Sequence, residues 1–302
     1  MALNRALFTK QLNLGLNTVF GMEYDRYPEQ WREIYSVEQS QKAFEEDVQM
    51  VGFGAAPTKA EGAAISYESG REGFVSRYVH ETIALAFSIT EEAEEDGLYG
   101  SLGAKYARAL ARSMQHTKEI KGANILNNAT TTSVGGDGVA LLSASHPLGG
   151  GGTASNTLAT PADLSETSLE QLLIQISTVV DDRNIPIALT GQKLIVPPQL
   201  VFIAERILKS NLRPGTADND INAMRNMGMI PGGVVVNQRL TDPDQYFIMT
   251  DCPDGMKHFV RSPMKKAVEG DFETGNLRYK VRERYSFGFT DWRTIFGSEG
   301  AA

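Results

Sequence analysis

The stretch TEEAEEDGLYGSLGAKYARALARSMQHTKEIKGANILN, Thr90–Asn127, decides the fold of this chain. Its apolar residues recur every four positions, at Leu102, Tyr106, Leu110 and Met114. This spacing predicts one apolar face on a long helix, with Lys, Arg and Gln on the other faces. Thr90 is a suitable N-cap, and the run of acids after it complements the helix dipole. Glycines between positions 97 and 103 predict a break before the uninterrupted part, Ala104–Asn127, which would span ~36 Å.

The bulk properties describe a globular protein with a real core. At 302 residues the chain can hold one large or two modest domains. No apolar run approaches the ~18 residues of a membrane span, and the N-terminus lacks the continuous apolar core of a signal peptide. Cys252 is the only cysteine, which excludes an internal disulfide and fits a reducing cytoplasm. The net charge of −8 argues against a general nucleic-acid-binding surface, but not against a protein that encloses nucleic acid.

The segment before the long helix divides into two parts. Residues 1–45 are expected to form an arm whose aromatic side chains pack on another surface, of this chain or of a neighbour. The alternative is an ordinary N-terminal helix on its own core. Residues 46–89 predict a long two-stranded excursion, with strands at Val48–Phe53 and in the alternating run Ile83–Ile89. Its charged, Gly-rich middle has too few apolar residues for a core, so we expect it to project.

Beyond the helix, the fold class is expected to be α+β. Residues 165–260 predict a compact unit of mixed helices and strands, beginning with a capping box at Thr167–Glu170. Its strand candidates are Lys193–Val196, Val234–Val236 and Tyr246–Met249. Residues 261–302 carry strands that are too few for an independent core. They are expected to return beside the long helix, which makes that domain discontinuous in sequence.

None of the motifs that carry chemistry is convincing. Gly149–Gly152 is not followed by Gly-Lys-Ser/Thr, so it predicts a flexible surface turn rather than a phosphate loop. Ser145 adjoins His146 in sequence, but adjacency gives no attack geometry, and an ordered loop is the better interpretation. The cluster around Cys252 and His258 lies in a turn and offers too few thiolates or imidazoles for zinc. We therefore expect no catalytic residue, no cofactor and no metal, and not an enzyme.

The order of these parts resembles the major capsid protein of tailed bacteriophages, which has the Hong Kong 97-type fold. The resemblance covers nearly the whole chain. The loop Leu142–Pro147, with the glycines and Ser155-Asn156 that follow, is similar to that of the Mu-type major head subunit family. Three further stretches are similar to that family: KLIVPPQLVFIAERILK at Lys193–Lys209, VVVNQRLTDPDQYFIMTD at Val234–Asp251, and VRERYSFGFTDWRTIFGSEG at Val281–Gly300.

The resemblance implies a domain map. Residues 1–45 would be the N-terminal arm and 46–89 the E-loop. The P-domain would combine 90–164, with its spine helix at 90–127, and the return strands 261–302. Residues 165–260 would be the A-domain, which gathers at the centre of hexamers and pentamers.

The resemblance also implies a function and partners. The chain would self-assemble into an icosahedral shell around double-stranded DNA, as part of the virion, in the host bacterial cytoplasm. Because the arm begins almost at Met1, a separate scaffolding protein is expected, together with a portal; a decoration protein is a further candidate partner. The alternatives are an encapsulin-type nanocompartment with enzyme cargo, or a soluble enzyme.

Two groups of charges are expected to contact neighbouring subunits. The first lies in the E-loop, at Lys59, Glu61, Glu68, Arg71 and Glu72. The second lies at period two on one strand face, at Arg278, Arg282 and Arg284, with Lys280 in the same row. That basic face suits carboxylates of a neighbour or phosphate, and a solvated face is the alternative. Lys59 is the only Lys of the E-loop, but no motif accompanies it and we predict no cross-linking.

Overall fold

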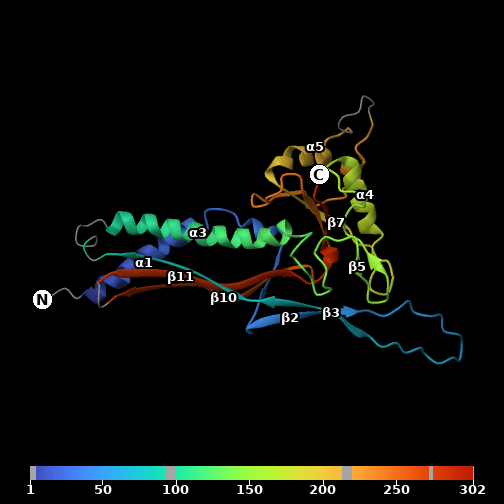
Figure 1. Ribbon diagram of the computed structural model, residues 1–302, viewed down its shortest axis with the longest axis horizontal. Coiled ribbons are helices and arrows are strands. Elements are labelled where there is room, and N and C mark those ends of the chain that lie inside the picture. Colours follow the sequence, from blue (N-terminus) through green and yellow to red (C-terminus); the bar gives the residue numbers. More distant parts are fainter. Residues whose placement is uncertain (1–4, 91, 93–98, 213–219, 272–274, 302) are drawn as a thin grey trace.

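The computed structural model describes residues 5–90, 92, 99–212, 220–271 and 275–301. Figure 1 shows an elongated unit, a compact unit at one end of it, and a hairpin that projects past the compact unit. The long helix is α3, Tyr99–Asn127, and α1, Arg5–Tyr24, packs along it. The helix passes through Gly100 and Gly103, so the expected break does not occur at these two glycines. Gly97 and most of the acidic residues that follow Thr90 lie outside the described residues.

The elongated unit consists of α1 and α3 laid on one face of a four-stranded sheet (Figure 1). In spatial order its strands are β1 (Ser36–Gln39), β10 (Met256–Gly270), β11 (Leu277–Phe289) and β4 (Glu81–Ile89). The strands β10, β11 and β4 are antiparallel, and β1 runs parallel to β10. The core between helices and sheet contains Leu16, Phe20, Leu110, Met114, Tyr279 and Val281. Tyr106, which the pattern assigned to the apolar face, is half exposed against Phe87.

The compact unit is built on a second four-stranded sheet. In spatial order its strands are β12 (Ile295–Ser298), β9 (Tyr246–Thr250), β7 (Gly191–Val196) and β8 (Val234–Val236). Its helices are α4 (Glu166–Ser177), α5 (Val201–Lys209) and α6 (Ala223–Met227). The apolar residues of α4 and of β7 are buried in one large core. The three predicted strands of this unit are present, and both β8 and β9 flank β7 rather than pairing with each other.

The projecting hairpin consists of β2 (Phe44–Val51) and β3 (Arg71–Val79). The two strands pair antiparallel from Phe44↔Val79 to Val51↔Arg71. We call this paired part the hairpin base. Residues 52–70, which contain no helix or strand, form the tip loop.

The first 45 residues pack on the same chain, because α1 buries Leu16 and Phe20 in its core; this is one of the two surfaces expected for an arm, and it also fits the alternative of an N-terminal helix on its own core. Three expectations need correction. The excursion ends at Val79, since β4 belongs to the sheet of the elongated unit. Near the C-terminus, β12 joins the compact unit rather than returning to the long helix. The capping box of α4 uses Ser165 and Ser168, two residues earlier than the motif indicated.

Candidate subunit-contact surfaces

One polar cluster fixes the hairpin base to the end of the elongated unit. The Asp47 carboxylate accepts a hydrogen bond from the Thr290 hydroxyl at 2.7 Å and forms an ion pair with Lys257. The Tyr78 hydroxyl lies 2.7 Å from the same Thr290 oxygen. Burial raises the pKa of Asp47, but the hydrogen bonds from Lys257 and Thr290 outweigh it and hold the pKa below its ordinary value of 3.8. Asp47 therefore stays ionised and paired.

A second cluster joins the hairpin base to the compact unit. The Arg293 side chain is only 2% exposed and pairs with Asp182 at 3.1 Å and with Asp291 at 3.2 Å. The Gln49 amide on β2 donates to Asp182 at 3.3 Å and to Asp291 at 3.2 Å. Burial raises the pKa of Asp291, and the Arg293 guanidinium opposes that effect. Because these charges are buried, the pairing depends on all three members being present.

The five charges that are expected to contact a neighbour from residues 46–89 divide into two sets. The Arg71 guanidinium donates to the Gly149 carbonyl, so it joins the hairpin to the compact part of the same chain. Glu68 pairs with Arg183 at 2.8 Å and accepts from the Gly54 amide at 2.8 Å. The other three have no ion pair within the described residues and are exposed: Lys59, Glu61 and Glu72. Two of the five therefore orient the loop within its own subunit, and three remain open to a neighbour.

The glycine run forms a turn at the surface, as the sequence predicts. It closes a two-stranded hairpin of β5 (His146–Pro147) and β6 (Thr153–Ala154). A Cβ on Gly150 would lie 2.5 Å from the Asp182 carbonyl oxygen, and Gly151 and Gly152 have φ of 100° and 91°. The expected surface turn is therefore present, and at Gly150 the close approach of Asp182 leaves no room for a side chain.

The sequence reasoning missed the apolar side chains of the tip loop. Phe53 is 63% exposed, Ile65 67% and Tyr67 96%. They lie beyond the hairpin base, where the loop projects past the body in Figure 1. Aromatic residues are enriched at protein–protein contacts, and the signal that could have found these three is their presence in a segment without a core.

The basic row on β11 lies on the sheet face opposite α3. Tyr279, Val281 and Glu283 are buried, whereas Arg278 and Arg282, which alternate with them, are exposed, as the period of two predicts. Small residues of β4 lie beside the row in register: Ser88, Ala86, Ala84 and Thr82 face Arg278, Lys280, Arg282 and Arg284. Near one end of the row, Arg278 pairs with Asp271 and Lys280 pairs with Glu269. Arg282 has no ion pair among the described residues, and the buried Arg284 Nε has no acceptor.

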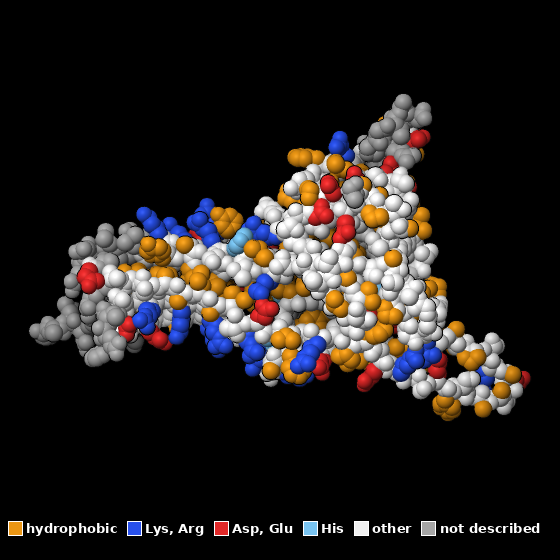
Figure 2. Space-filling model, in the orientation of Figure 1, with side chains coloured by type: hydrophobic (Ala, Val, Ile, Leu, Met, Phe, Trp, Pro, Cys, Tyr) orange, Lys and Arg blue, Asp and Glu red, His pale blue; other side chains and the backbone are white. Residues whose placement is uncertain are grey.

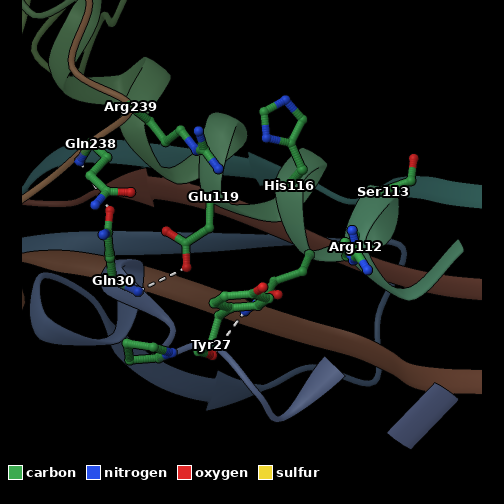
Figure 3. A pocket seen from close by; sticks show the side chains of 10 residues that line it. Tyr27, Gln30, Arg112, Ser113, His116, Glu119, Gln238 and Arg239 are labelled. Atoms are coloured by element: carbon green, nitrogen blue, oxygen red, sulfur yellow. Dashed lines mark hydrogen bonds between the residues drawn. The ribbon is translucent and has the colours of Figure 1, made fainter. Parts of the chain in front are cut away.

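An open groove of about 660 Å³ lies where the N-terminal segment, α3 and the compact unit meet. Figure 3 shows Arg112 and His116 of α3, Arg239 of the compact unit and Tyr27 around it. Its floor is held by Glu119, which accepts hydrogen bonds from the amides of Gln30 at 2.8 Å and Trp31 at 3.2 Å. Burial raises the pKa of the Glu119 carboxyl, and the two amides oppose that effect.

His146 has structural partners, and the neighbouring Ser145 hydroxyl lies 3.4 Å from the Ser143 hydroxyl instead of bonding to its ring. Its imidazole is fully buried and stacks on Trp292 with ring centroids 4.3 Å apart. Nδ1 lies 2.6 Å from the Asp137 carboxylate and Nε2 lies 3.3 Å from the Asn156 amide oxygen. The buried Asn156 amide in turn donates to the Leu141 carbonyl at 2.6 Å and to the Ile295 carbonyl at 2.9 Å. This network holds the loop Leu142–Pro147 against the compact unit.

Among the described residues, no group of three His, Cys, Asp or Glu side chains has an arrangement that could hold a metal ion. The helices in the same described ranges are all too short or too polar to cross a membrane.

A family model described as phage capsid protein matches residues 74–297 of the chain. No curated protein matches it. Similar solved structures include the capsid of the Cyanophage P-SCSP1u, with a TM-score of 0.57 and 10% identity, over 87% of this chain and 85% of that one. The capsid of an empty GTA particle has a TM-score of 0.55 and 13% identity, over 91% and 90% of the two chains. A virus-like particle from Pyrococcus furiosus has a TM-score of 0.53 and 11% identity, over 94% and 98%.

Proposed function

This chain belongs to the phage capsid protein family, and we propose that it is the subunit whose hexamers and pentamers build an icosahedral head around double-stranded DNA. It has the Hong Kong 97-type capsid fold of tailed-phage major capsid proteins. It is a capsid protein of the virion and assembles with copies of itself into a shell. An encapsulin-type compartment is less well supported than a phage head, because the matching family is one of phage capsids.

The finer assignments are also proposals. The elongated unit corresponds to a P-domain, the compact unit to an A-domain, and the hairpin with its tip loop to an E-loop. Assembly takes place in the host bacterial cytoplasm with a portal and a separate scaffolding protein, and a decoration protein is a further candidate. The chain has no catalytic activity of its own. A shell subunit needs contacts that repeat over a closed surface, and many modest contacts then sum to a stable assembly.

The tip loop carries the proposal. Three large apolar side chains on it are mostly exposed, and the loop has no core that could cover them. A stable monomer would gain nothing from such a loop. Burial of these side chains by an adjacent subunit would instead contribute a favourable free energy of about 25 cal/mol for each Å² of apolar area removed from water.

The open charges of the hairpin include two exposed carboxylates that are complementary to the basic row on β11, Glu61 on the tip loop and Glu72 on β3. Lys59 on the tip loop is exposed as well. The basic row on β11 presents Arg282 and Arg284 without a carboxylate partner among the described residues. We propose that these two sets meet between subunits. Glu68 and Arg71 set the direction of the loop through Arg183 and Gly149.

Deleting Ala55–Gly70 tests the proposal. Val51 and Arg71 are paired in register, so the deletion leaves Gly52-Phe53-Gly54 as a three-residue connection, a length that hairpins use readily. The cores of both units are untouched. We expect the variant to keep the circular dichroism spectrum of the wild type and to form no stable shells by light scattering and negative-stain microscopy.

Two results would contradict this. Unfolding of the variant would show that the tip loop belongs to the core of the subunit. Normal shells would show that the tip loop contacts nothing needed for assembly. As a matched control, Glu205→Gln with Lys209→Gln removes an exposed ion pair of 2.6 Å from α5 and should leave the fold unchanged.

A further inference from the structure

The exposed side of α3 carries a row of basic residues that the subunit contacts proposed above do not use. We call it the cationic stripe, and its members are Lys105, Arg108, Arg112 and His116. Their spacing of three and four residues places them on one face of the helix, over about 16 Å at 1.5 Å per residue. All four are exposed. Figure 2 shows blue side chains along the edge of the elongated unit where α3 runs in Figure 1.

Among the described residues, the stripe makes one ion pair, between Arg112 and Glu23. The one acid in the sequence from Tyr99 to Asn127 is Glu119, and it is buried beneath the N-terminal segment. Lys105 and Arg108 make no ion pair within the described residues. Arg112 pairs with Glu23 at 2.8 Å but keeps 58% of its side chain exposed. Glu23 itself is buried, so it presents little negative charge to solvent.

The groove of Figure 3 extends the stripe onto the compact unit. Arg112 and His116 form one side of it, and Arg239 contributes a further guanidinium from the segment after β8. Within the described residues the Arg239 side chain makes no hydrogen bond or ion pair; only its backbone groups do. The basic surface therefore continues across the junction between the two units of the fold.

We propose that the cationic stripe and the groove bind the phosphates of double-stranded DNA without reading its sequence. Protein–DNA interfaces are more strongly positive than protein–protein interfaces, whose centres are depleted in Lys. Ala109, an exposed neighbour of Lys105 and Arg112, is small enough for a phosphate backbone to approach. This inference rests on the proposed function, because the duplex would be the enclosed genome.

The charge distribution favours the cationic stripe over the basic row on β11 as the surface that binds DNA. There, Arg278 and Lys280 already pair with Asp271 and Glu269. The net charge of −8 opposes binding elsewhere, so contact with a polyanion should be confined to the stripe. Weak, confined contacts would order the outermost DNA without preventing its release.

Two double variants separate position from net charge. Lys105→Gln with Arg108→Gln removes two charges from the stripe, and Gln preserves helix propensity. Arg206→Gln with Lys209→Gln removes two exposed charges from α5 of the compact unit, which carries none of the proposed contacts. Both variants have the same net charge, so any difference between them comes from where the charges lie.

The measurement is the affinity of unassembled subunits for a labelled duplex of about 30 base pairs, by fluorescence anisotropy, between about 50 and 200 mM salt. For the stripe variant we expect the slope of log affinity against log salt to fall in magnitude by about 2, or about 1 for each lost phosphate contact. The α5 variant should keep the wild-type slope. Circular dichroism checks that both variants fold.

Three results would overturn the inference: no duplex binding by the wild type, equal losses in both variants, or displacement of the duplex by polyglutamate as readily as by unlabelled DNA. The last would identify the stripe as a surface for an acidic protein. Negative-stain microscopy of the same samples tests the proposed function separately. If the wild type forms shells but the stripe variant keeps the wild-type salt slope, this inference alone is overturned. If the stripe variant has a smaller slope but the wild type forms no shells, the proposed function alone is overturned.

Discussion

The base and the tip of the hairpin are parts of one excursion, yet they are held by opposite means. The base has its polar groups paired with both units of its own chain, through Asp47, Gln49 and Arg71. The tip loop has exposed apolar side chains, with Tyr67 as the extreme case. The base therefore has a fixed direction in the free subunit, while the tip has surface that only another molecule can cover.

This difference shows how a subunit can be prepared for assembly before it meets a neighbour. Orienting the base in advance lowers the entropy that must be lost when the tip binds. Changes at the base should therefore alter the stability of the single chain. Changes at the tip should alter assembly and leave stability almost unchanged. The following predictions test this division, from the largest expected effect on stability to the smallest.

Replacing Arg293 should have the largest effect. Arg293→Met leaves Asp182 and Asp291 buried without their cation, which we expect to cost about 3–5 kcal/mol in the free energy of unfolding measured in urea. Arg278→Met is the matched control, since Arg278 is exposed and its pair with Asp271 should contribute at most about 1 kcal/mol. Equal losses in the two variants would show that the buried cluster does not hold the base.

Adding one methyl group compares the two regions directly. In Gly150→Ala the new Cβ would lie 2.5 Å from the Asp182 carbonyl oxygen, so we expect a loss of about 1–3 kcal/mol. In Gly52→Ala, where the tip loop begins, no atom lies within 4 Å of the new Cβ and stability should change by less than about 0.5 kcal/mol. A Gly150→Ala protein as stable as the wild type would show that the backbone at Asp182 moves aside at no cost.

Acid should weaken the base through Asp47. Its pKa is lowered in the folded state, so its pairing stabilises the fold above the ordinary value of 3.8 and is lost as the pH falls through the lower folded value. The difference in unfolding free energy between wild type and Asp47→Asn should therefore shrink as the pH is taken from about 5 to about 2. A difference that stays constant over this range would show that Asp47 is not ionised in its pair.

Single changes at the tip should be almost silent in stability. Glu68→Gln breaks a partly exposed pair with Arg183 and should cost at most about 1 kcal/mol. Tyr67→Ser should cost still less, because Tyr67 contacts solvent rather than a core. It should nevertheless reduce the yield of shells in light scattering more than Glu68→Gln does. Loss of stability without loss of shells in Tyr67→Ser would reverse the roles assigned to base and tip.

The sequence by itself determined the parts that depend on local patterns. The period-four residues that include Leu110 and Met114 predicted α3, and both lie in its core. Alternation predicted β4 as a strand, and short apolar runs predicted β7, β8 and β9. The period of two also placed Arg278 and Arg282 on one exposed face. Periodicity is a property of a few consecutive residues, so it can be read without knowing what the segment touches.

The tertiary structure alone decided the partners. Nothing local shows that β4 joins β11 or that β12 joins β9, because the joined segments lie far apart in the chain. The same holds for the division of the E-loop charges, since Arg71 reaches a carbonyl 78 residues away. The Arg293 pair with Asp182 spans 111 residues, and the Lys257 pair with Asp47 spans 210. Such contacts depend on how distant elements pack together, and charge or apolarity alone does not specify which of many possible partners a side chain will meet.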